Sequence, residues 1–167
     1  KSNNFNGQEF ASKDTASDRA QSYAGEGVTI HDDRSRCSHA GVCSDNLSTV
    51  FKFGVEPWID PNGAEADEII RVVGLCPSGA LTYSLAGASE WVERPEDPSI
   101  TVAKDGPLAV RGLPVVAGDG EAYDTRERQA LCRCGGSHNK PFCDGSHWYM
   151  GFKHAMGDDA GLSSSEE

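Results

Sequence analysis

The sequence predicts an α+β chain folded as two small lobes, and three observations carry that prediction. Its 167 residues leave room for one medium domain or two small ones. Hydrophobic residues make up 37% of the chain and the mean hydropathy is −0.50. Such a chain has little core material, so bound metal is an expected source of stability. The apolar runs are short, and a polar stretch with two prolines at residues 87–98 is interpreted as a linker around Trp91.

The first lobe is expected at residues 28–86, after an N-terminal arm at residues 1–27. The arm is rich in Ser, Asn, Asp, Ala and Gly and shows no sustained period. The clearest element of the lobe is a helix with Ile69, Ile70 and Val73 on one face. We expect a strand at Val28–Ile30, a short helix at Asp45–Val50, and two apolar islands at Phe51–Phe53 and Pro57–Ile59. A turn at Asp60–Gly63, this helix at Ala64–Val73 and a closing strand at Leu81–Leu85 are expected to follow.

The second lobe is expected at residues 99–156, followed by a mobile acidic tail at residues 157–167. Short apolar runs separated by turn sequences predict a small antiparallel β-structure. A short helix is expected over Asp144–Tyr149. The apolar runs occupy Ile100–Val102, Leu108–Val110 and Leu113–Ala117.

The second lobe contains a complete set of soft metal ligands within residues 131–147. Cys132, Cys134, Cys143 and His147 follow the spacing C-x-C-x8-C-x3-H. Three thiolates and one imidazole suffice for a four-ligand site. Cys143 and His147 stand at i and i+4, so a helix that begins beside them directs both side chains to the same face.

This motif resembles the CDGSH iron–sulfur proteins, the mitoNEET group. The resemblance implies a [2Fe–2S] cluster, with Cys132 and Cys134 on its inner iron and Cys143 and His147 on its outer iron. It also implies that Asp144, Gly145 and Ser146 line the cluster. A structural zinc site with the same four ligands remains the alternative. A disulfide scaffold is less suited, because a histidine stands among the ligands and six cysteines are sparse in this chain.

The first lobe holds a second group of cysteines. Cys37 and Cys43 form a C-x5-C pair, and Cys76 is followed by proline. This segment resembles a single-cluster bacterial ferredoxin of the divergent kind that accompanies CDGSH motifs. The middle ligand position is Ala40, which cannot bind iron. Three thiolates suit a [3Fe–4S] cluster, whereas a [4Fe–4S] cluster requires a fourth ligand, for which His39 is the candidate. The alternatives are that His39 is an ordinary exposed residue and that the three cysteines are buried thiols without a cluster.

The charge of the chain restricts its partners. The 26 acidic and 15 basic residues give a net charge of −11, which argues against nucleic acids and anionic membranes. It favours a redox protein, or an apo-protein that accepts clusters, with a basic docking patch. No apolar run reaches membrane-spanning length, and iron-ligating cysteines suit a reducing, cytoplasmic compartment.

No motif of a substrate-processing enzyme is recognisable. The function expected from the sequence is therefore one-electron transfer by two iron–sulfur centres. The alternatives are a cluster carrier, a sensor of redox state or pH, and a zinc-stabilised interaction domain. Both a homodimer and a single chain are compatible with the sequence.

Overall fold

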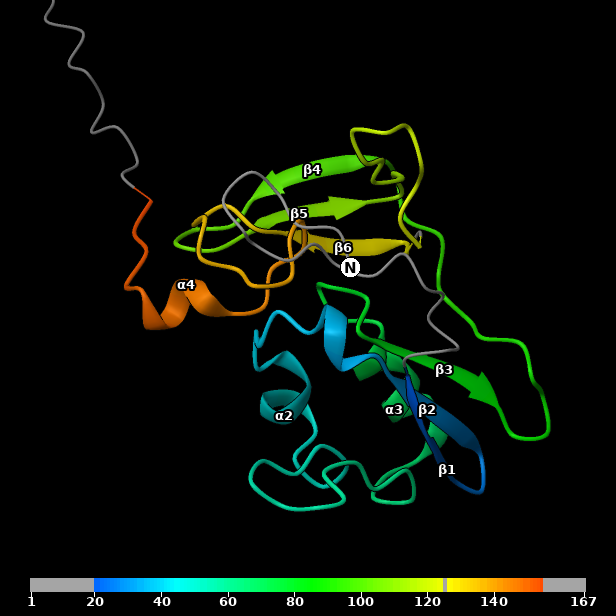
Figure 1. Ribbon diagram of the computed structural model, residues 1–167. Helices are drawn as coiled ribbons and strands as arrows, with labels where there is room; N and C mark the ends of the chain where they lie inside the picture. The colour runs from blue at the N-terminus through cyan, green and yellow to red at the C-terminus, as the bar shows by residue number, and fades with distance from the viewer. Residues whose placement is uncertain (1–19, 125, 155–167) are drawn as a thin grey trace, which may run out of the picture.

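Two antiparallel sheets of three strands organise the part of the chain that the computed structural model describes, residues 20–124 and 126–154 (Figure 1). The first sheet has the order β1-β2-β3, with β1 at Gln21–Ala24, β2 at Val28–Asp32 and β3 at Leu81–Leu85. The second has the order β4-β5-β6, with β4 at Ser99–Val102, β5 at Leu108–Arg111 and β6 at Arg128–Leu131. An α+β chain of two small units is thereby confirmed, while its ferredoxin-like character stays a prediction.

The N-terminal lobe is built around β2, which pairs on both sides. Ile30 faces Tyr23 of β1 and Tyr83 of β3, and its side chain is fully buried. The closing strand β3 has the predicted bounds. β1 corrects our expectation of an arm that extends to residue 27. Three of its four residues are exposed, so the segment lacks the alternation that identifies a half-buried strand.

Two helices follow β2 in the N-terminal lobe. α2 spans Val42–Asn46 rather than the predicted Asp45–Val50. It starts earlier because Gly41, with φ +74°, turns the chain into it, and it ends where Leu47 leaves the helix to enter the core. α3 spans Ala66–Val73, so it starts two residues later than predicted but ends at Gly74 as predicted. The two apolar islands form a single bridge between Phe51 and Ile59 rather than regular strands.

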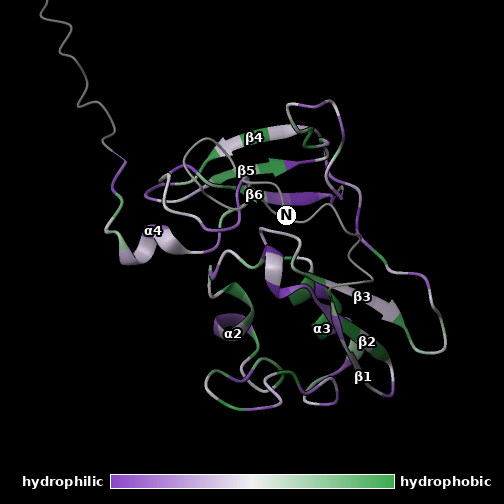
Figure 2. Cartoon of the chain, viewed as in Figure 1, coloured by the Kyte–Doolittle hydropathy of each residue, from purple (hydrophilic) through white to green (hydrophobic). Residues whose placement is uncertain are grey.

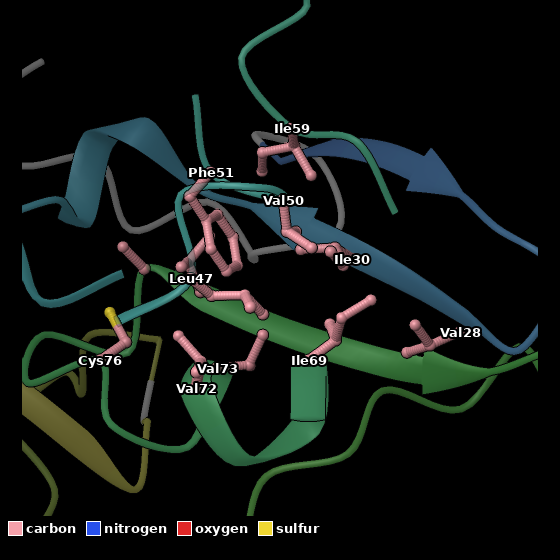
Figure 3. Close-up of a cluster of buried hydrophobic side chains, with 12 residues drawn as sticks. Val28, Ile30, Leu47, Val50, Phe51, Ile59, Ile69, Val72, Val73 and Cys76 are labelled. Atoms are coloured by element: carbon pink, nitrogen blue, oxygen red, sulfur yellow. The ribbon is translucent and has the colours of Figure 1, made fainter. Parts of the chain in front are cut away.

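The hydrophobic core of the N-terminal lobe reaches one of its cysteines. β2, α3 and the α2–α3 connection supply the side chains, and Cys76 lies at the edge of the cluster (Figure 3). Its largest fully buried members are Phe51, Ile30, Ile59 and Ile69. At roughly 25 cal/mol per Å² of apolar surface, the burial of each of these side chains contributes about 2 kcal/mol to the folding free energy. This lobe therefore has an apolar core of its own.

The C-terminal lobe has a much smaller apolar core. The run Leu113–Ala117 forms no strand and makes one isolated bridge, from Val116 to Ala122. The last helix, α4, is Ser146–Tyr149 and so starts later than predicted. β6 is coloured hydrophilic in Figure 2, although Arg128 and Gln129 are buried. Polar side chains thus replace apolar ones where this sheet faces the N-terminal lobe.

Three buried arginines join the lobes. Arg126 donates from Nη2 to Asp33 at 3.2 Å, and this ion pair is almost completely buried. Its Nη1 donates to the carbonyl of Gly79 at 3.1 Å. A buried pair of this kind is costly to break, because one charge is then left without its partner in a low-dielectric interior.

The other two arginines reach across in opposite directions. Arg36, from the N-terminal lobe, donates to the carbonyl of Asp124 at 2.7 Å. Arg128, from β6, donates to the carbonyls of Val73 and Gly74 at the end of α3. These last carbonyls of a helix lack partners within it, so a cation there is favourable. The interface is therefore specified by directional hydrogen bonds.

Trp91, in the predicted linker, contacts both lobes. Its ring stacks on His31 of β2 with centroids 4.0 Å apart, and the guanidinium carbon of Arg126 lies 6.0 Å from its ring. His31 is itself buried, with hydrogen bonds to Ser22 and Ser84.

Several expected features fall outside the described residues. They are residues 1–19 of the arm, residues 155–156 of the second lobe and the tail at 157–167. No helix among the residues that the structure describes is long and apolar enough to cross a membrane.

Candidate metal centres

A short antiparallel bridge shapes the C-terminal site. Leu131 pairs with Phe142, and Cys132 N–H donates to the carbonyl of Pro141 at 2.8 Å. Cys143 N–H in turn donates to the carbonyl of Ala130 at 2.8 Å. These bonds place Cys132 and Cys143 on neighbouring segments, although ten residues separate them in the sequence.

The four predicted ligands of this site come together as two close pairs. The Sγ atoms of Cys132 and Cys134 are 3.9 Å apart. Cys143 Sγ lies 3.3 Å from His147 Nδ1, because α4 brings the imidazole back over Cys143. Two thiolates on one tetrahedral metal ion, each about 2.3 Å from it, stand roughly 3.8 Å apart. The spacing of each pair therefore suits two ligands on one metal ion.

The backbone directs N–H groups at two of these sulfurs. Gly136 N–H donates to Cys134 Sγ at 3.4 Å, and Gly145 N–H donates to Cys143 Sγ at 3.5 Å. Burial raises the pKa of Cys143 to about 11, and the thiols of Cys132 and Cys134 add to this effect. Burial disfavours the charged imidazole and so lowers the pKa of His147, whereas the negative charge of Asp144 acts to raise it. Thiolates gathered in this way require a bound cation to balance them.

Asp144 fixes the shape of the loop between Cys143 and α4. Its carboxylate accepts hydrogen bonds from the Ser146 hydroxyl at 2.6 Å, the Ser146 amide at 3.0 Å and the His138 amide at 2.9 Å. Burial opposes ionisation of this carboxyl, but these donors outweigh it and lower the pKa to about 2. Gly145 follows with φ +84°, a conformation that favours glycine. Asp144 and Ser146 thus fix the loop between two predicted ligands, and the Gly145 amide donates to one of them. That these three residues line a cluster stays a prediction.

The N-terminal site collects three cysteines from separate segments. Cys37 follows a short 3-10 helix at Arg34–Arg36, Cys43 lies in α2, and Cys76 follows α3. All three line one small cavity of about 30 Å³, with Ala80 and Leu81 on its apolar side. The cavity brings together cysteines that are up to 39 positions apart in the sequence.

Of the N-terminal cysteines, Cys76 is buried, whereas Cys37 and Cys43 are partly exposed. Burial raises the pKa of Cys43 to about 11, and the nearby Cys76 thiol acts in the same direction. Burial also raises the pKa of Cys37, against the effect of the His39 amide, which donates toward its sulfur. Cys76 Sγ lies 3.7 Å from the Ser78 hydroxyl. The donor set and its polar contacts fit a cationic metal centre.

His39 and Ala40 both line the cysteine cavity. Ala40 occupies the middle position of the loop and offers no donor. His39 adopts φ +53°, which is uncommon for a residue other than glycine. A Cβ atom on Gly145 would lie 3.0 Å from His39 Cβ and 3.1 Å from His39 Cδ2, so the histidine packs on the loop of the other site.

Sequence reasoning missed the arginines that support the sites. Arg133 stands between two predicted ligands and donates to the carbonyls of Gly106 and Ala103 at 2.9 and 2.7 Å. These bonds tie the cysteine loop to the β4–β5 turn. Arg36 directly precedes Cys37. The available signal was that each arginine adjoins a predicted ligand cysteine, which is a position where a guanidinium can orient a loop.

Within the described part of the chain, no three His, Cys, Asp or Glu side chains converge closely enough to hold a single ion. The C-terminal donors are grouped as two pairs, and the three N-terminal thiols line one small cavity. The paired arrangement of the C-terminal donors fits a cluster of several metal ions, in which different ligands bind different ions.

Comparison with known proteins identifies both lobes. Residues 23–86 match the model of a divergent 4Fe-4S mono-cluster domain, and residues 105–148 match the model of an iron-binding zinc finger of CDGSH type. The chain thus contains a divergent mono-cluster domain followed by a CDGSH-type iron-binding domain. The two domains follow each other in the predicted order. We call them the mono-cluster domain and the CDGSH domain.

The mono-cluster domain also has relatives that consist mostly of such a domain. The uncharacterized protein YjdI of Escherichia coli K12 is 33% identical over 61 residues, which are 36% of this chain and 80% of that protein. The YjdI protein of Escherichia coli O157:H7 matches to the same extent. The chain is therefore an iron–sulfur protein. The cluster types, the ligand role of each residue and the domain boundaries stay predictions.

Proposed function

We propose that this iron–sulfur protein carries single electrons on two centres. One is a [2Fe–2S] cluster on Cys132, Cys134, Cys143 and His147, and the other is a cluster on the thiolates of Cys37, Cys43 and Cys76. The observation that carries the proposal is the presence of two separate, partly buried sets of soft ligands in one small chain. In both, backbone N–H groups are directed at sulfur. Such hydrogen bonds stabilise reduced, more negative sulfur ligands and so tune the potential.

The chain contributes positioning and shielding to this chemistry. When bound, the clusters accept and release one electron each. Asp144 and the Gly145 amide hold Cys143 and His147 in place. The aliphatic side chains beside Cys76 shield that thiol of the other centre from water. We assign no substrate-processing step, and the proposed partner is a redox protein whose basic patch complements the net charge of −11.

Iron and sulfide quantitation with EPR spectroscopy of the purified full chain tests the proposal. We expect about two irons for the CDGSH domain and three or four for the mono-cluster domain, by the cluster types named above. A [3Fe–4S] centre is paramagnetic when oxidised, whereas [2Fe–2S] and [4Fe–4S] centres give signals after reduction. Colourless protein that contains zinc would overturn the proposal. Transfer of the visible chromophore to an apo-ferredoxin, without reversible reduction, would favour a cluster carrier instead.

Two paired variants assign the signals. Cys132→Ser with Cys134→Ser removes the predicted inner-iron ligands of the CDGSH domain. Cys37→Ser with Cys43→Ser removes two predicted ligands of the mono-cluster domain. Each pair is expected to remove one signal and the corresponding iron, and to leave the other signal in place.

A further inference from the structure

The two sets of predicted ligands are carried by loops that pack directly against each other. One loop is residues 35–39, which contains Cys37. The other is residues 139–145, which contains Cys143. We call the packing of these two segments the loop contact. Figure 1 shows the corresponding region, where α4 and the segment before it approach α2 and the turn after β2.

Three pairs of residues form the loop contact. Asn139 donates from its side-chain amide to the carbonyl of Ser35. The guanidinium carbon of Arg36 lies 3.7 Å from the centre of the Phe142 ring, a cation–π distance. His39 packs on Gly145 so closely that a Cβ there would lie 3.0 Å from its own Cβ.

These pairs flank the ligands on both loops. Arg36 precedes Cys37 and Phe142 precedes Cys143, while His39 and Gly145 each follow their cysteine by two positions. Each of the three pairs includes a residue no more than two positions from Cys37. At about 3.8 Å between consecutive Cα atoms, this is at most about 8 Å along the chain. The ligands therefore lie close to the surface at which the domains meet.

A cavity gives independent support for this closeness. A cavity of about 810 Å³ is lined by Cys37, His39 and Cys43 of the mono-cluster domain and by Trp148 and Tyr149 of α4. The two aromatic residues directly follow His147, the predicted imidazole ligand. The helix of one site thus overhangs the cysteine loop of the other.

Buried polar contacts hold this arrangement in place. Arg36 is 2% exposed and Arg126 is 4% exposed, and both bond across the domain boundary. Such bonds are directional, so the two domains have one preferred relative position.

We propose that the loop contact makes the two iron–sulfur sites an electron-exchanging pair within one chain, with His39 as a positioning residue between them. The inference rests on the proposed function. An exchange moves one electron from the reduced site to the oxidised site. One site is oxidised as the other is reduced, and no bond and no proton is transferred. The immediate electron partner of each site is then the other site of the same molecule.

EPR spectroscopy of the dithionite-reduced holoprotein tests the pairing. In the intact chain, two nearby paramagnetic centres are expected to broaden or split each other's signals and to relax faster. The paired Cys→Ser variants described above supply the spectrum of each site alone. Their sum should differ from the spectrum of the intact chain.

The outcomes separate this inference from the proposed function. If the spectrum of the intact chain equals the sum of the single-site spectra, the sites are independent and the inference is wrong, although both centres still carry electrons. If neither centre can be reduced, the proposed function itself is wrong.

A variant of His39 tests the positioning role. His39→Ala removes the ring from Gly145, and it should slow re-equilibration of a single injected electron severalfold, measured by pulse radiolysis of the holoprotein. Phe53→Ala is the control, because that aromatic ring belongs to the mono-cluster domain and is 95% exposed. It should leave the rate unchanged. An unchanged rate in His39→Ala would show that His39 does not position the two sites. A changed cluster type in that variant would make His39 a ligand and overturn the positioning role.

Discussion

The mono-cluster and CDGSH domains hold their predicted ligands by opposite means. In the mono-cluster domain the cysteines come from three distant segments, and a shared apolar core with Phe51 and Ile69 fixes those segments. In the CDGSH domain all four ligands lie within 16 residues, and hydrogen bonds within the loop arrange them. Its buried apolar residues are few, with Val110, Tyr123 and Phe142 the largest.

This difference indicates which domain depends more on its metal. A lobe with its own core has folding free energy that does not come from metal binding. A lobe whose loop contains clustered thiols and polar side chains gains much of its stability when a metal binds and when the neighbouring domain packs on it. The following predictions test this distinction, starting with the largest effect.

Loss of one CDGSH ligand should loosen that domain alone. Cys143→Ser is expected to accelerate amide hydrogen exchange in β4, β5 and β6 at least about tenfold, while β2 and α3 keep their protection. The matched variant Cys37→Ser should affect exchange only near its own loop. Hydrogen-exchange mass spectrometry measures both. Equal loss of protection in the two domains after Cys143→Ser would contradict the distinction.

The next largest effect is expected at the domain boundary. Arg126→Ala leaves Asp33 buried without this partner, and loss of such a pair costs about 3–5 kcal/mol of unfolding free energy. Urea denaturation measures the change. The control is Arg111→Ala, which removes a surface ion pair to Glu96 at 3.0 Å and should cost about 1 kcal/mol or less. Similar losses in the two variants would show that the buried pair does not join the domains.

Asp32 of the mono-cluster domain should lower stability at neutral pH. Burial raises its pKa to about 6, against the effects of Arg34 and the Trp58 indole N–H. The folded chain therefore binds the proton more tightly than the unfolded chain, whose aspartates titrate near 3.9. The contribution of this group to stability is largest below pH 4 and is lost as the pH rises to about 6.

Asp32→Asn should remove this loss of stability. Between pH 4 and pH 7, the unfolding free energy of the variant is thus expected to rise by roughly 1–2 kcal/mol relative to that of the unchanged chain. Thermal unfolding across this pH range measures it. A variant with the same pH dependence as the unchanged chain would mean that the pKa of Asp32 is the same in the folded and unfolded states.

Asp144 of the CDGSH domain should raise stability at neutral pH, which is the opposite of the effect expected for Asp32. Its carboxylate accepts three hydrogen bonds, and Asp144→Asn weakens them without removing the side chain. Because the group is partly exposed to solvent, the expected loss is about 1 kcal/mol at pH 7. Thermal unfolding of the two asparagine variants side by side gives the comparison, and a gain in stability for Asp144→Asn would contradict it.

Local patterns predicted the elements that are fixed by local forces. α3 has its apolar face and its glycine stop, and β3 has the predicted bounds, because periodicity and turn residues act within a few positions. β1 was missed, and α2 was misplaced. The first is exposed on most of its residues, and the second is bounded by the burial of Leu47, which depends on the tertiary core.

The sequence by itself determined which residues carry sulfur and imidazole, their grouping in two sets and the order of the two domains. Ligand spacing is a property of neighbouring positions, so the chain alone reveals it. Only the tertiary structure decided that the two cysteine loops meet, with His39 on Gly145 and Arg126 on Asp33 across 93 residues. Contacts of that range arise from the packing of whole lobes and leave no periodic signal in a single sequence.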